Sequence, residues 1–245
     1  MSGLSALPPL AEPERPAGFF ANLIDIYFAP GDAFANLLRK PSFHVPLLLH
    51  VVLSLTFTGI YLQKVDMGAF FAARMEEAGR TGSIPAERME QIEQWTRVSF
   101  WAIGALLPPI AVFGLGGLFL FVYRFFYASE VDYAQSLAIV ASAFAAFALL
   151  LTPLMLGVLA LKDDWTIPPQ EAFQANLTLL LDRQATAKAL WALAGSLDLI
   201  SFWQMFVLAS GFGVASKRTW SGALAGIAVP WALFVMAKVG WAFLR

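Results

Sequence analysis

Residues 134–161 read AQSLAIVASAFAAFALLLTPLMLGVLAL, an apolar run without a single charged side chain. An α-helix rises about 1.5 Å per residue and the hydrocarbon layer of a bilayer is about 30 Å thick, so about 20 apolar residues can cross it as a helix. The run lacks the strict alternation expected of a barrel strand. It therefore predicts a transmembrane helix.

The composition of the whole chain agrees with this prediction. Of its 245 residues 59% are hydrophobic and 13% charged, and the mean hydropathy is +0.67. A water-soluble domain of this length could not bury so much apolar surface. The predicted fold class is therefore all-α, a polytopic membrane helical bundle of about five transmembrane helices plus interfacial amphipathic helices. The predicted spans are His44 to Leu62, Phe100 to Val122, Ala134 to Leu161, Ala189 to Val214 and Gly222 to Phe243.

Charge and cysteine content exclude several classes of function. The formal net charge is −1, which provides no basic surface for nucleic acid. The chain contains no cysteine, so disulfides, thiolate metal sites and a catalytic thiol are excluded. The first thirty residues lack the basic start, apolar run and cleavage site of a signal peptide. We expect the first span to act as an uncleaved insertion signal.

The N-terminal region divides into two parts before the first span. Residues 1–17 contain four prolines among Ser, Ala and Glu, a composition that predicts a flexible Pro-rich tail. Residues 18–40 predict interfacial amphipathic helices, because bulky residues from Phe19 to Phe28 share one face of a helix too short to span. The candidate interfacial anchor consists of apolar residues and a basic pair: Phe20, Ile24, Phe28, Arg39 and Lys40.

Residues 41–245 form the predicted five-span domain, with a helical insert at about 64–98. In the insert, apolar residues from Met67 to Met75 follow a helical stripe, and Ser83 with Pro85 resembles a second helix start. The insert predicts a small helical cap resting on the membrane. After the third span, Pro168 opens a segment predicted to be a similar amphipathic helix, with one face formed by Phe173, Leu177, Leu180 and Leu181. Five spans place both long loops on one side of the membrane.

Asp198 is the acidic residue that lies well inside a predicted span. An ionised carboxylate in hydrocarbon costs several kcal/mol, so Asp198 is expected to face the bundle interior. It could act as a proton or ion site, contact a partner, or be a structural hydrogen-bond centre with Ser201, Gln204 or Lys238. Lys238 could instead extend towards the interface. The candidate intramembrane polar site comprises Asp198, Trp203, Gln204 and Lys238.

Residue patterns for catalysis or cofactor binding are missing from the sequence. No nucleophile with a histidine base, zinc-protease motif or phosphate-binding loop occurs. His44 and His50 are six residues apart, which does not place them on one helical face, and no other ligand type stands at suitable spacing. No catalytic residue, cofactor or metal site is predicted.

Two stretches resemble a known family. Residues 28–37, FAPGDAFANL, followed by RKPSF at 39–43, resemble the opening of prokaryotic members of the YIP (Ypt-interacting protein) domain family. Residues 197–204, LDLISFWQ, are similar to that family's aspartate-to-tryptophan fourth span. The resemblance implies five spans and a cytoplasmic N-terminus. It also implies links to vesicle traffic and small GTPases in eukaryotes, and to export or transporter assembly in some prokaryotes. The insert Lys64 to Arg97 departs from the family pattern.

These observations favour a non-enzymatic integral membrane protein of the YIP-like type, a scaffold or accessory factor for membrane traffic, export or transporter assembly. The alternative is a small transporter or channel that uses Asp198 as its coupling carboxylate. Expected partners are membrane lipids and other membrane proteins or a second copy of the chain. The expected location is the cytoplasmic membrane of a prokaryote. The basic pairs Arg39–Lys40 and Lys217–Arg218 favour a cytoplasmic N-terminus, whereas the total count of basic residues in the loops opposes it.

Overall fold

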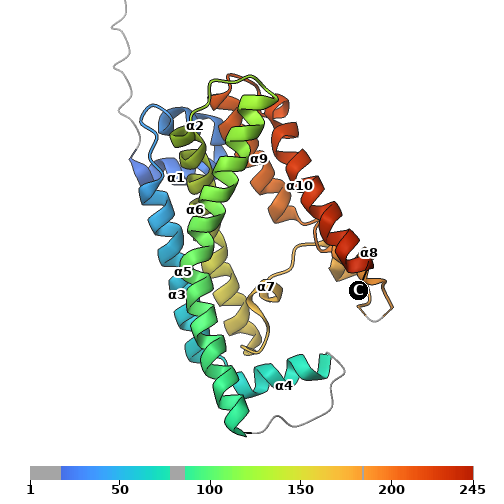
Figure 1. Ribbon diagram of the computed structural model, residues 1–245. Helices are drawn as coiled ribbons and strands as arrows, with labels where there is room; N and C mark the ends of the chain where they lie inside the picture. The colour runs from blue at the N-terminus through green and yellow to red at the C-terminus, as the bar shows by residue number, and fades with distance from the viewer. Residues whose placement is uncertain (1–17, 78–85, 184, 245) are drawn as a thin grey trace, which may run out of the picture.

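The computed structural model describes residues 18–77, 86–183 and 185–244, and their regular secondary structure is helical (Figure 1). The predicted tail at 1–17 and the predicted helix start at Ser83 and Pro85 lie outside the described residues. Along the chain the helices are α1 Phe19–Phe28, α2 Pro30–Leu37, α3 His44–Lys64, α4 Met67–Glu77, α5 Ala86–Phe125, α6 Tyr133–Lys162, α7 Pro169–Ala172, a short 3-10 helix Leu177–Leu180, α8 Lys188–Ala194, α9 Leu199–Ala215 and α10 Trp220–Phe243.

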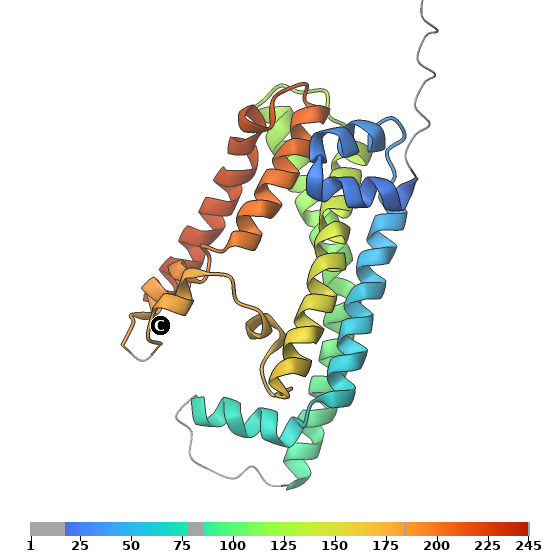
Figure 2. The same ribbon diagram turned by 180° about the vertical axis from the view of Figure 1, so that it is seen from behind.

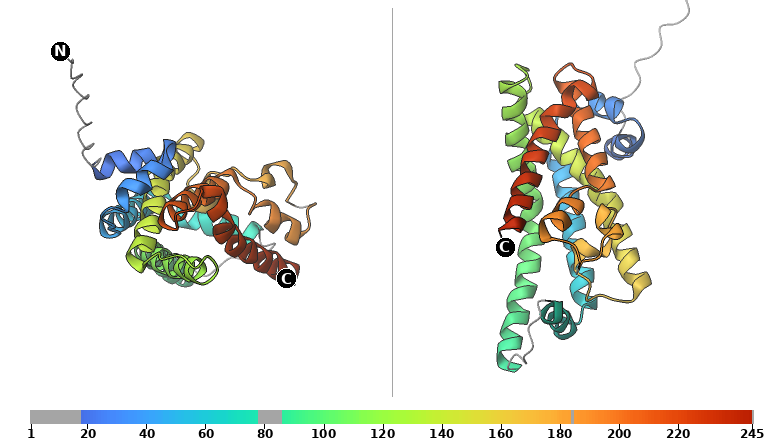
Figure 3. Two further views of the ribbon diagram at one scale, coloured as in Figure 1. Left: turned by 90° about the horizontal axis from the view of Figure 1, so that it is seen from above. Right: turned by 90° about the vertical axis from the view of Figure 1, so that its right-hand side faces the viewer.

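Four of the described helices are long and apolar enough to cross a membrane: α3, α5, α6 and α10. They correspond to the predicted first, second, third and fifth spans, so the predicted helical membrane bundle is confirmed. Helices α3, α5 and α6 alternate in direction, and α10 runs in the same direction as α6 (Figure 1). Seen from above, α3 and α10 lie at opposite sides of the molecule, with α5, α6 and α9 between them (Figure 3).

The prediction of one continuous helix for the fourth span, Ala189 to Val214, is wrong. It consists of α8 with 7 residues and α9 with 17, separated by Gly195 to Asp198. At about 1.5 Å per residue, α9 is about 26 Å long, which is shorter than the hydrocarbon layer. The break has a local cause. Short side chains such as Ser196 and Asp198 hydrogen-bond to nearby backbone, and glycine weakens a helix interior.

The insert also differs from its prediction. Residues expected to form a separate cap helix continue directly into the second span, so that α5 has 40 residues. Its length of about 60 Å is twice the hydrocarbon thickness, so one end of α5 must project beyond it. The other half of the insert, α4, lies across the end of the bundle (Figure 1). The insert is therefore partly a helical extension of the bundle.

The segment after α6 lacks the predicted amphipathic helix. It contains α7 with four residues and the 3-10 helix Leu177–Leu180, because Pro168 and Pro169 open it and Asn176 adopts an extended backbone that caps the 3-10 turn. The segment does meet the insert, since Arg74 of α4 forms an ion pair with Glu171 of α7 at 3.7 Å. Both long loops therefore lie at one end of the bundle, and their location on one side of the membrane stays a prediction.

The main core forms where α2, α6 and α9 meet, at the end of the bundle opposite the long loops (Figure 2). Phe34 of α2 and Ile139 of α6 are completely buried and approach the backbone of α9 at Gly211. A Cβ atom added at Gly211 would lie 2.6 Å from Ile139 Cγ2 and 3.1 Å from the Phe34 ring. Glycine at position 211 thus permits the close contact that holds α2 and α9 against α6.

We predict that Gly211→Ala lowers the free energy of unfolding by about 1–3 kcal/mol. The added methyl group would clash with Ile139, whose β-branched side chain has little rotamer freedom within a helix. Thermal unfolding of the purified protein in detergent measures the change. Gly157→Ala is the control, because no atom lies within 4 Å of its added Cβ. Equal losses of stability in the two variants would contradict this account of the core.

Candidate functional site

Helix α1 is amphipathic, with its two faces in different surroundings. Leu23 and Ile26 are buried against the bundle, whereas Phe20, Ile24 and Phe28 are 67%, 52% and 85% exposed. The predicted stripe of bulky residues is therefore divided, and the candidate anchor residues form its outer face. This outer face, defined as Phe20, Ile24 and Phe28, is available to lipid or to another protein.

Tyr27 attaches α1 to the bundle. Its hydroxyl donates a hydrogen bond to the carbonyl oxygen of Ala146 in α6, and its ring stacks on Trp203 with centroids 5.6 Å apart and planes at 15°. Trp203 also stacks on Phe147 of α6 at 6.3 Å. Burial raises the pKa of the Tyr27 hydroxyl above its usual value. Trp203 thus joins three helices through its ring.

Asp198 lies at the start of α9 and not inside a continuous span, which corrects the expected position. Its Oδ1 accepts a hydrogen bond from the backbone N–H of Ser201 at 2.7 Å, and its Oδ2 accepts one from the Ser201 hydroxyl at 2.5 Å. This is the arrangement of a helix N-cap, which satisfies a backbone donor that the helix itself leaves free. Of the alternatives considered, the geometry matches the structural hydrogen-bond centre.

Lys238 does not pair with Asp198. Its Nζ donates a hydrogen bond to Ser196 Oγ at 3.0 Å, and Ser196 belongs to the break between α8 and α9. A second contact holds this break, because the backbone N–H of Leu199 donates to the carbonyl of Ala175 at 3.1 Å. Lys238 and the segment before α8 therefore hold the break from two sides.

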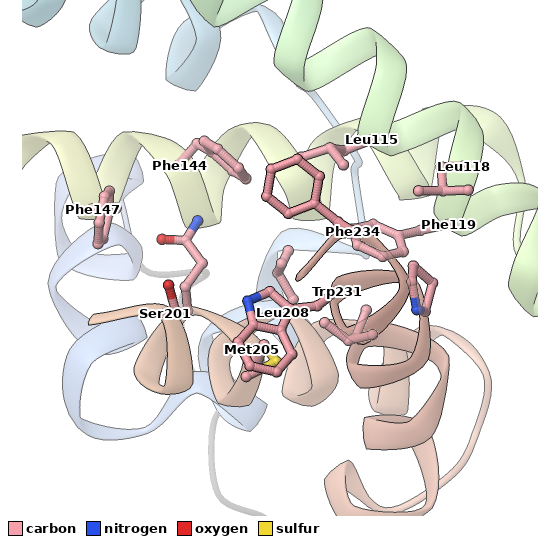
Figure 4. A pocket seen from close by; sticks show the side chains of 13 residues that line it. Leu115, Leu118, Phe119, Phe144, Phe147, Ser201, Met205, Leu208, Trp231 and Phe234 are labelled. Atoms are coloured by element: carbon pink, nitrogen blue, oxygen red, sulfur yellow. The ribbon is translucent and has the colours of Figure 1, made fainter. Parts of the chain in front are cut away.

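Gln204 lies on a cavity that sequence reasoning did not find. The cavity has a volume of about 500 Å³ and lies between α5, α6, α9 and α10. Figure 4 shows Phe144 and Phe147 of α6 facing Ser201, Met205 and Leu208 of α9 across it. Its walls come from four separate helices, so no local sequence pattern predicts it. The one indication in the sequence was the polar side chain of Gln204 in a largely apolar helix.

The side-chain amide of Gln204 has no hydrogen bond within the part of the chain that the structure describes, although both its nitrogen and its oxygen are buried. The expected hydrogen bond between Gln204 and Asp198 is therefore not formed. Buried amides are normally paired, because leaving one unpaired costs about 1–3 kcal/mol. Gln204 is the unusual polar group of this cavity.

The predicted basic pairs gather at one end of the bundle, together with α1 and α2. Arg39 and Lys40 follow α2, while Lys217 and Arg218 lie in the turn between α9 and α10 (Figure 2). The Arg218 guanidinium lies over the Tyr127 ring at 5.1 Å. Asp25, Asp32, Glu130 and Asp132 lie at the same end. The basic pairs are therefore local clusters close to helix ends, the position in which basic residues favour a membrane surface. Among residues 18–77, 86–183 and 185–244, no group of three or more potential metal ligands occurs.

The long apolar helices, the exposed outer face of α1 and the basic pairs together define a polytopic helical membrane protein. Residues 24–241 match the Yip1 domain, and the chain therefore belongs to the Yip1 domain family. The match runs from within α1 to within α10 and includes α4 and α5. No curated protein and no solved structure matches the chain.

The cap at Asp198 leads to a prediction that distinguishes hydrogen bonding from charge. Asp198→Leu should lower the free energy of unfolding by about 1 kcal/mol, because leucine cannot accept the Ser201 N–H. Asp198→Asn should be close to wild type, since asparagine caps as well as aspartate. Thermal unfolding in detergent compares the two. Equal unfolding temperatures for the two variants would show that the Asp198 cap does not stabilise the break between α8 and α9.

Proposed function

We propose that this Yip1 family protein is a non-enzymatic scaffold or accessory factor, which binds another membrane protein in membrane traffic, export or transporter assembly. One observation carries the proposal. The outer face of α1 presents three large apolar side chains, while the other face of the same helix is fixed to α6 and α9 through Tyr27. A rigidly held apolar face is typical of a binding surface.

The size of the outer face agrees with a role in binding. Burying one Phe or Ile side chain contributes about 1.5–3 kcal/mol, so three together can hold a helix against lipid or a partner. A partner helix or the bilayer would cover the same side chains. Through Trp203, α1 packs on α9 as well as on α6, so the outer face is held at a fixed position on the bundle.

We further propose that this end of the bundle lies in the cytoplasm, in the inner membrane of a prokaryote. Supporting this orientation, Arg39, Lys40, Lys217 and Arg218 lie at the same end of the bundle as α1 (Figure 2). Basic residues close to span ends in short connections favour the cytoplasmic side. Cysteine accessibility at position 217, in a chain that has no native cysteine, tests this orientation directly.

Photo-crosslinking from position 24 tests the proposed binding surface. A photoreactive residue there, in cells expressing the full chain, should capture one dominant membrane protein. The triple variant Phe20→Ser, Ile24→Ser and Phe28→Ser should lose that protein in pull-downs, because each serine removes apolar area from the contact. The control is Leu179→Ser with Leu180→Ser, two side chains exposed to a similar extent at the other end. Capture that persists in the triple variant would contradict the proposal.

A second candidate function is a small transporter or channel that uses Asp198. The observation favouring it is the break at Gly195 to Asp198, since discontinuous helices line the substrate sites of many transporters. The hydrogen bonds from Ser201 leave the carboxylate occupied as a cap, which places this function second.

Flux assays on liposomes containing the purified protein distinguish the two functions. If the protein is a scaffold, we expect no protein-dependent movement of H⁺, Na⁺ or K⁺. If it is a transporter, we expect flux that Asp198→Asn abolishes, because asparagine keeps the cap but cannot carry a proton. Flux lost in Asp198→Asn with unchanged stability would establish transport and overturn the scaffold proposal.

A further inference from the structure

The cavity between α5, α6, α9 and α10 has the features of a ligand site. We propose that it binds a lipid-soluble molecule whose apolar body fills the cavity and whose carbonyl or hydroxyl group hydrogen-bonds to the Gln204 amide. The site is separate from the outer face of α1, so the proposal stands apart from the scaffold function. Three observations carry it: the size of the cavity, its opening, and its buried amide.

The size and lining of the cavity suit an apolar ligand. Its volume of about 500 Å³ falls within the range of small-molecule sites, which is about 300–1,000 Å³. Its walls are mostly aromatic and aliphatic side chains, and the polar groups of the lining are the side chains of Ser201 and Gln204 and the indole N–H of Trp231 (Figure 4). Ligand sites commonly combine such an apolar lining with a few polar groups that set orientation.

The cavity opens towards the bilayer. Leu118 of α5 and Phe234 of α10 both line it and are 41% and 67% exposed. They belong to two of the described helices that are long and apolar enough to cross a membrane, so the exposed parts of their side chains face lipid. A ligand dissolved in the membrane can therefore enter between α5 and α10 without passing through water.

The buried amide specifies the chemistry of the ligand. Gln204 lines the cavity and offers a donor N–H and an acceptor oxygen, neither of which has a partner within the described residues. Neighbouring atoms cover both, so the side chain must turn into the cavity to meet the ligand. The neighbouring Ser201 hydroxyl already donates to Asp198. A pure hydrocarbon would leave the amide unpaired at a cost in free energy, whereas a carbonyl accepts the amide N–H and a hydroxyl can pair with either atom.

The depth of Gln204 restricts the ligand further. The cavity residues Phe144 and Phe147 lie near the middle of α6, which runs from Tyr133 to Lys162. The polar group of the ligand must therefore lie at a depth well below the lipid headgroups, within an otherwise apolar molecule. Two sources have this chemistry: the acyl ester of a membrane lipid and the ring ketone of a lipid-soluble quinone.

Competition labelling in nanodiscs tests the site on the full-length protein. The probe is a phosphatidylglycerol with a photoactivatable diazirine on one acyl chain, and labelled peptides are identified by mass spectrometry. We expect labels on α5, α9 and α10 peptides that line the cavity. Competition by unlabelled dioleoylphosphatidylglycerol alone identifies an acyl lipid, and competition by decylubiquinone identifies a ring ketone. Competition by hexadecane as strong as by either would overturn the role of the amide.

Two variants with matched controls separate binding from folding. Gln204→Leu should weaken competition by the carbonyl compound about tenfold, which is the worth of one hydrogen bond. It should leave the unfolding temperature in detergent equal or higher, because an unpaired buried amide has been removed. Leu118→Trp should block labelling by filling the opening, whereas Leu107→Trp, an exposed α5 residue outside the lining, should not. Wild-type labelling of both Gln204→Leu and Leu118→Trp would overturn the proposal.

Discussion

The structure depends on one constraint: backbone N–H and C=O groups in apolar surroundings must be hydrogen-bonded within the protein. Helical hydrogen bonds satisfy it along most of α3, α5, α6 and α10, although Pro108, Pro109, Pro153 and Pro230 each leave one carbonyl without its helical donor. The break between α8 and α9 requires other partners, and the chain supplies them. Asp198 accepts the Ser201 N–H, Ala175 accepts the Leu199 N–H, and Leu193 accepts the Leu197 N–H. The extended segment before α8 thus supplies one of the hydrogen bonds that the break requires.

The short α9 explains two further features. Its apolar surface contacts α2 at Gly211 and α1 through Trp203, so the interfacial helices are packed on the bundle as well as near the bilayer surface. Residues of the same stretch of α9, from Ser201 to Leu208, line the cavity between α5, α6, α9 and α10. The same helix therefore supports the binding face of α1 and one wall of the cavity.

Local pattern predicted individual elements well and their partners poorly. The apolar runs marked α3, α6 and α10 almost to the residue, because hydropathy depends on composition alone. The run at Ala189 to Val214 failed, since averaging over a window conceals four residues that leave the helix. Of the candidate polar site, Asp198 has a local cap, Lys238 a different partner, and Gln204 none among the described residues. Spacing along one helix cannot reveal which side chains of another helix face it.

The amino-acid sequence by itself determined that this chain is a helical membrane protein with an amphipathic N-terminal helix and a Yip1-like pattern. The first two properties follow from apolar content and helical periodicity, which are local, and the third is a resemblance of two short stretches to a known family. Tertiary structure alone decided that Trp203 stacks on Tyr27, that Asp198 caps a helix, and that Gln204 borders a cavity. The stack and the cavity depend on side chains of separate helices, whose relative rotation is set by packing across the bundle. The cap is a local contact, but it exists only because the chain leaves the helix before Asp198.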